Sequence, residues 1–134
     1  MGRKKEWYMD YAVHAFTFYA LMGRPTREEY VERLHRTGQD IDKMQGAVLD
    51  IEAVNKMLEQ LQEEHRQYII AAVEETYFKN TRGKPEYGDI KLAVTRLTFQ
   101  LYASDRTVQR WLEYAKLLFS KLRGLNTGAD GDLW

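Results

Sequence analysis

Three side chains in the stretch YASDRTVQRWL, residues 102–112, have the chemistry needed to recognise the edges of base pairs. Arg106 and Arg110 carry planar guanidinium groups that can each donate two hydrogen bonds to a guanine, and Gln109 can pair in the same way with an adenine. Each such contact discriminates against a wrong base by roughly 1 to 3 kcal/mol. This chemistry requires a helix that holds the three side chains on one outward face.

The sequence around these residues predicts such a helix and a support for it. Ser104 is a preferred N-cap residue, and Val108 and Trp111, three positions apart, would form the inner side of the helix that follows. A preceding amphipathic helix over residues 89–101 would pack Leu97 and Leu101 against that inner side.

The turn between these two helices is very short. Only Tyr102 and Ala103 separate residues 89–101 from the second helix, which spans residues 104–124. A helix-turn-helix needs such a turn, because its second helix enters the major groove while the first rests across the backbone. We expect an ordinary backbone conformation at Tyr102, since residues other than glycine seldom have a positive φ.

The last half of the chain resembles the C-terminal helix-turn-helix of sigma-factor region 4 and, more closely, phage transcriptional regulators of the RinA and ArpU type. The resemblance covers AAVEETYF and GDIKLAVTRLTFQLYASDRTVQRWLEYAKLLF, with an S-x-x-T-V-x-R core. This chain has Thr98 where the pattern has a small residue and Tyr102 where it has the turn glycine. Carried over by position, the residues facing the groove would be Ser104, Asp105, Arg106, Gln109 and Arg110, with Thr107 near a phosphate. The resemblance implies a regulator that reads promoter DNA.

The charge distribution agrees with an anion-binding C-terminal part. Residues 79–124 contain ten Lys or Arg and four Asp or Glu, a net charge of +6, so the rest of a chain whose formal total is zero carries −6. Six basic residues are candidates for phosphate contacts, which give affinity without sequence information: Arg82, Lys84, Lys91, Arg96, Lys116 and Lys121.

The N-terminal half predicts helices of a different kind. We expect a helix over residues 6–22, a second one that begins with a capping box at Thr26 and Glu29 and ends near Gly38, and a third over 68–78. The segment KNTRGKPEYGD, residues 79–89, has the composition of a loop.

A longer helix from residue 40 to 61 carries an apolar seam. Its seam positions recur every three or four residues: Ile41, Met44, Val48, Ile51 and Leu58, with Asn55 between the last two. Asparagine at an inner position sets the register of paired coiled coils, so the seam could join two copies of the chain. The alternative is that the seam packs on the first helix of its own chain.

The first helix is unusually aromatic. Its aromatic side chains occupy more than one face: Trp7, Tyr8, Tyr11, Phe16, Phe18 and Tyr19. Either this helix lies at the centre of the core, or it exposes a patch that joins a partner, such as a second copy or RNA polymerase.

Neither an enzyme nor a metal site is indicated. The chain has no cysteine, and His14, His35 and His65 lack a second ligand at helical spacing, so we expect no cofactor and no metal. We expect His14 to be half-buried and the other two to be solvated. No apolar run approaches the length of a membrane-spanning helix.

These observations predict an all-α protein of the bacterial cytoplasm and nucleoid that binds double-stranded DNA, with a dimer favoured. We divide the chain into a helical scaffold or oligomerisation part (1–78), a helix-turn-helix part (79–124) and a flexible tail (125–134). The function expected is transcription regulation in a phage or prophage. Two alternatives stay open: a phage small terminase subunit for DNA packaging, and a helical adaptor that binds proteins and never touches DNA.

Overall fold

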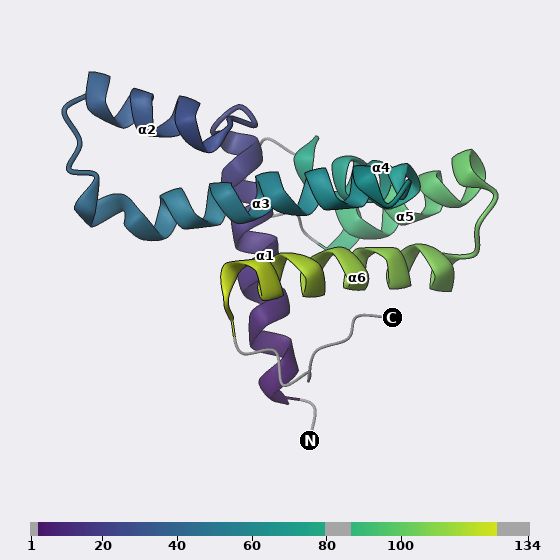
Figure 1. Cartoon of the computed structure of the whole chain (residues 1–134). Helices are drawn as coiled ribbons and strands as arrows, with labels where there is room; N and C mark the ends of the chain where they lie inside the picture. Colours follow the sequence, from purple (N-terminus) through teal and green to yellow (C-terminus); the bar gives the residue numbers. More distant parts are fainter. Residues whose placement is uncertain (1–2, 80–86, 126–134) are drawn as a thin grey trace.

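The computed structural model describes residues 3–79 and 87–125, which contain only helices and turns (Figure 1). The α-helices are α1 (Arg3–Leu21), α2 (Arg27–Arg36), α3 (Gln45–Glu63), α4 (Gln67–Val73), α5 (Tyr87–Leu101) and α6 (Asp105–Arg123). A 3₁₀ turn, η1 (Asp42–Met44), precedes α3, and α4 continues as a π-helical segment, η2 (Glu74–Phe78). The all-α class is confirmed. None of the described helices is both long and apolar enough to cross a membrane.

Local signals place the first two helices within a few residues of their predicted bounds. The predicted capping box is present: the Glu29 backbone N–H donates to the Thr26 hydroxyl at 3.1 Å, and the Thr26 N–H donates to the Glu29 carboxylate at 2.8 Å. Two exposed backbone donors at the start of α2 are thereby satisfied. Gly38, just beyond the end of α2, has a positive φ of 73°.

Helix α1 lies at the centre of the core. Figure 1 shows α3 and α6 running side by side across it. Phe16 is fully buried, with its ring centroid 5.5 Å from that of Phe119 in α6 and 5.7 Å from that of Tyr77 in η2. Most of the aromatic side chains of α1 are buried or half-buried in this way, although Trp7 remains exposed. The central position explains why α1 is aromatic on more than one face.

The apolar seam of α3 packs within its own chain. Val48 and Ile51 are buried in the core formed with α1 and α6. The Asn55 side chain accepts a hydrogen bond from the Arg27 N–H at 2.9 Å and donates one to the Pro25 carbonyl at 3.2 Å. Asn55 therefore fixes the start of α2 on α3, and the intrachain alternative is the one observed for this seam.

One core spans the proposed boundary at residues 78 and 79. Helix α6 packs against α1, α3, α4 and α5, and its C-terminal two-thirds is buried on several sides. The described residues on the two sides of this boundary therefore share one core. At the first residue of the predicted tail, the Leu125 N–H donates to the Ser120 carbonyl at 2.9 Å and the Leu125 side chain packs on the core. Residues 126–134 lie outside the described part.

A half-buried polar network ties three of these helices together. The Arg123 Nε of α6 and the Tyr11 hydroxyl of α1 both donate to the same Asp50 carboxylate oxygen of α3, each at 2.8 Å. Burial raises the pKa of Tyr11, so its hydroxyl keeps the proton that it donates. This network fixes the C-terminal end of α6, the end opposite the residues with base-reading chemistry.

Candidate nucleic-acid interface

The turn between α5 and α6 differs from our expectation at one residue. Tyr102 has a φ of 52°, in the left-handed region, instead of the ordinary conformation expected. The physical reason is the way in which α5 ends: the Ala103 N–H donates back to the Thr98 carbonyl at 3.3 Å, and this closure requires a left-handed residue directly before Ala103. The turn thus has the conformation that glycine usually provides, with tyrosine in its place.

The predicted N-cap of α6 is present. The Thr107 N–H donates to the Ser104 Oγ at 3.1 Å, and the Ser104 hydroxyl itself donates to the Thr107 Oγ1 at 2.9 Å. Ser104 and Thr107 therefore stabilise the first turn of α6 instead of extending freely into solvent. The Thr107 hydroxyl can still donate to an external acceptor.

The first two turns of α6 project polar side chains outward, as predicted. All five candidate groove residues are exposed: Ser104 at the cap, then Asp105, Arg106, Gln109 and Arg110. Arg106, Gln109 and Arg110, together with Glu113, line a shallow hollow of about 380 Å³. Glu113 was not foreseen as part of this surface, and its carboxylate reduces the net positive charge there.

The inner side of these turns is partly different from the prediction. Val108 is buried, as predicted. The other fully buried residue on this side is Leu112, which takes the inward position that we expected for Trp111, the residue before it. Trp111 is only half-buried at the edge of the core, where its ring centroid lies 4.9 Å from that of Tyr68 in α4. The supporting helix behaves as expected, because Leu97 is buried and Leu101 is half-buried against the same core.

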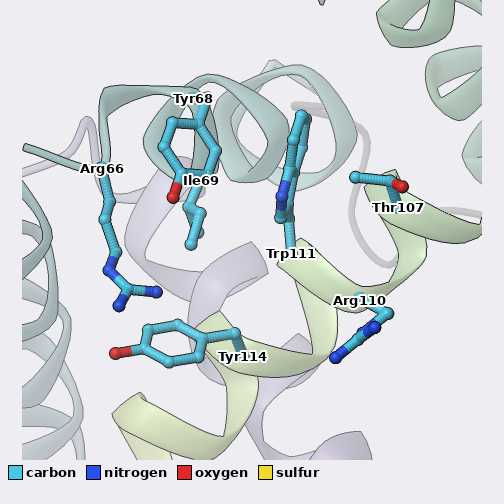
Figure 2. Close-up of a pocket in the computed structure, with 7 residues that line it drawn as sticks. All are labelled: Arg66, Tyr68, Ile69, Thr107, Arg110, Trp111 and Tyr114. Carbon is cyan, nitrogen blue, oxygen red and sulfur yellow. The ribbon is translucent and has the colours of Figure 1, made fainter. Parts of the chain in front are cut away.

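A second hollow, of about 260 Å³, lies between α4 and the same turns of α6, as Figure 2 shows. Its lining comes from two separate segments: Arg66, Tyr68 and Ile69, then Thr107, Arg110, Trp111 and Tyr114. We call it the α4–α6 hollow. It adjoins the first hollow, since Arg110 lines both.

Arg66 is held in place by two contacts in the α4–α6 hollow. Its Nε lies 3.3 Å from a Glu64 carboxylate oxygen, and its guanidinium carbon lies 4.6 Å from the centroid of the Tyr114 ring. Burial raises the pKa of Tyr114, so its protonated hydroxyl donates to Glu64 at 3.3 Å. Our sequence reasoning missed Arg66 and Tyr68, because residues about 40 positions away complete their surroundings.

The structure brings together only some of the predicted phosphate-binding residues. Lys91 is exposed on α5. Arg96 is also on α5, but its Nη1 is paired with the Glu75 carboxylate at 2.7 Å. Lys116 is half-buried, with its Nζ 5.4 Å from the Tyr77 ring centroid. Lys116 and the half-buried Lys121 lie roughly 15 and 22 Å along α6 from Arg106, at a rise of about 1.5 Å per residue. Arg82 and Lys84 lie outside the described residues.

The histidines form no site in the described part of the chain. His14 is exposed, not half-buried as expected, because α1 turns its other faces toward the core. His35 and His65 are exposed as predicted. Within residues 3–79 and 87–125, no group of His, Asp or Glu side chains is arranged to hold a metal ion.

Comparison with known proteins leaves this site to be interpreted from its own geometry. No protein-family model, curated protein or solved structure matches the chain.

Proposed function

We propose that this protein binds double-stranded DNA through the first two turns of α6 and regulates transcription. The observation that carries the proposal is the joint exposure of Arg106, Gln109 and Arg110 on a helix whose opposite side is buried at Val108 and Leu112. Their planar or bidentate donors suit base edges in the major groove. The left-handed turn and the serine cap that precede them agree with a helix-turn-helix.

The attachment of α6 to the core supports this role. Residues 105–110 cover roughly 9 Å of helix, and the major groove, about 12 Å wide, admits an α-helix. The remainder of α6 is packed into the core, so the N-terminal end can enter a groove without unfolding anything. Side chains on such a fixed element lose little freedom when they bind.

Two acids limit the electrostatic part of binding. Asp105 and Glu113 are both exposed beside the arginines. A carboxylate can accept a hydrogen bond from the cytosine amino group, so Asp105 would contribute to base preference, but it also repels phosphates. We therefore expect weak non-specific affinity and a shallow dependence of binding on salt concentration.

The test is selection of preferred duplexes from a random pool, followed by titration of the selected duplex at several salt concentrations. Arg110→Ala should weaken binding by roughly five- to 150-fold, equivalent to about 1–3 kcal/mol, and relax the preference at one base position. Arg36→Ala removes the same charge from an exposed site on α2 and serves as the matched control. If the wild-type protein fails to bind any duplex at low salt, the proposal is wrong. Rings of eight or more subunits in native mass spectrometry would favour the DNA-packaging alternative.

A specific observation also favours a protein-binding surface on α5. Leu92, Phe99 and Tyr102 are 59%, 77% and 96% exposed, and Leu92 and Phe99 share one face of the helix because they are seven residues apart. Most aromatic side chains of α1 are covered, so a protein partner would meet α5 rather than α1.

We infer that the partner at this face is a second copy of the chain. Antiparallel pairing of two α5 helices would set Leu92 against the partner's Phe99, and Arg96 between them is already paired with Glu75, which it shares with Lys79. Sedimentation velocity should then show a dimer that Phe99→Ser converts to monomer, whereas Leu21→Ser, at an exposed position of α1, should have no effect. If the wild-type protein is a monomer at all concentrations, the dimer is wrong, and this face would bind another partner, such as RNA polymerase.

A further inference from the structure

The α4–α6 hollow gathers hydrogen-bond donors around one open space. Figure 2 shows the Arg66 guanidinium, the Tyr68 hydroxyl and the nitrogen-bearing edge of the Trp111 indole around this space, with the Tyr114 ring below them. The ion pair of Arg66 with Glu64 uses Nε. Among the described residues, no hydrogen bond to protein occupies the Arg66 Nη groups, the Tyr68 hydroxyl or the Trp111 Nε1–H. A hollow with several donors and few acceptors is suited to an anion.

The charge and the walls of the hollow favour the same kind of ligand. Two guanidinium groups, those of Arg66 and Arg110, line the hollow, and the Arg66 group pairs with Glu64 through its Nε. The aromatic rings of Tyr68, Trp111 and Tyr114 exclude part of the solvent, which strengthens a charge-assisted hydrogen bond made there. Because Arg66 is already held by Glu64 and by the Tyr114 ring, its guanidinium needs little rearrangement to bind.

We propose that the α4–α6 hollow binds a phosphate group, with Arg66 as the principal ligand and with Tyr68 and Trp111 as neutral donors. The expected source rests on the proposed function: a backbone phosphate of the duplex that α6 reads. Arg110 lines both the hollow and the base-reading surface, so a phosphate in the hollow lies about one helical turn from Arg106 and Gln109. Half the width of the major groove, about 6 Å, separates a helix in the groove from the flanking phosphates, so the two contacts are compatible. A phosphate on a free small molecule is the other source of the same chemistry.

The first arm of the test measures duplex affinity as a function of salt for the full chain. Arg66→Ala should weaken binding about tenfold for the preferred and for an unrelated duplex alike, and should lower the slope of log affinity against log salt by about one, as expected for loss of one phosphate contact. Glu64→Gln should strengthen binding a few-fold, because it removes the negative charge that offsets Arg66, while the Tyr114 ring still positions the guanidinium. Tyr68→Phe keeps the ring on Trp111 and loses only the hydroxyl, so a loss of about threefold is expected without a packing defect. Arg36→Ala, which makes the same change in net charge far from α6, should have little effect.

The second arm follows the Trp111 indole N–H by NMR, with the resonance assigned from Trp111→Phe, while inorganic phosphate is added. A phosphate-dependent shift that Arg66→Ala abolishes, with duplex affinity unchanged in that variant, would assign the hollow to a free phosphate compound. If Arg66→Ala binds duplex like the wild type and phosphate leaves the Trp111 resonance in place, the proposal is wrong. If the wild type binds no duplex, the proposed DNA function is wrong. The phosphate titration then decides separately whether the hollow binds phosphate.

Discussion

Replacing Tyr102 with glycine should stabilise the protein. Tyr102 has a φ of 52°, a left-handed conformation that places a Cβ atom close to the following carbonyl oxygen. Its side chain is 96% exposed, so the ring makes almost no contacts that could offset this strain within the chain. Glycine at the same position ends helices without the Cβ penalty.

The size of the effect follows from three contributions. Relief of the left-handed strain is worth about 1–2 kcal/mol. Glycine also lowers the free energy of unfolding by about 0.4–1 kcal/mol, because it gives the unfolded chain greater conformational freedom. Loss of the tyrosine ring costs only about 0.2 kcal/mol of buried apolar surface, because about 4% of a side chain of roughly 200 Å² is covered. The net expectation for Tyr102→Gly is a gain of about 0.6 kcal/mol, with an upper limit near 1.4 kcal/mol.

Urea denaturation, followed by far-UV circular dichroism, measures this change. The midpoint should rise while the m-value stays the same, because the surface exposed on unfolding hardly changes. Tyr102→Ala is the control: alanine keeps the Cβ atom and removes only the ring, so its stability should match the wild type within about 0.3 kcal/mol. The reasoning fails if glycine lowers the midpoint, or if alanine raises it as much as glycine does.

Two further substitutions test local interactions. Hydrogen bonding from Lys79, assisted by Arg96, lowers the pKa of Glu75, so the unfolded chain takes up this proton at a higher pH than the folded chain. The stabilisation by Glu75 is therefore present above about pH 4.5 and is lost as the pH falls through its lowered pKa. Glu75→Gln should be less stable at pH 7 and should lose less stability than the wild type between about pH 5 and 3 in acid titrations of urea midpoints; parallel curves would contradict this. Thr26→Ala removes the acceptor for the Glu29 N–H and should cost about 1 kcal/mol in the same assay, whereas Thr26→Ser should cost much less.

The features that could be predicted from the sequence are those that depend on neighbouring residues. The capping box at Thr26 and the N-cap at Ser104 depend on residues within three positions, and both are present. The helical periodicity likewise gave the all-α class and the buried position of Val108. These signals are local because the groups that need hydrogen bonds at a helix start belong to the helix itself.

The features that were missed depend on where distant segments pack. Periodicity offers both Trp111 and Leu112 as inward residues of α6, and only the position of Tyr68 on α4 decides that the tryptophan lies at the edge. For the same reason the sequence could not show that Arg66 adjoins Arg110. The left-handed Tyr102 was missed because tyrosine disfavours that conformation, whereas the closure of the α5 terminus at Ala103 requires it.

The packing of α6 explains why the candidate site lies at its N-terminal end. From Leu112 to Ser120 the helix is the central packing element for α1, α3 and α4, and Arg123 ties its last turn to Asp50. Most positions along this part are buried, and a side chain that reads bases would lose its hydrogen-bond partners there; Glu113 and Lys116 are the polar side chains of this part that reach solvent. Only the first two turns extend past the core, so base-reading chemistry and exposure coincide there. The α4–α6 hollow lies beside these two turns because the start of α4 flanks them on one side.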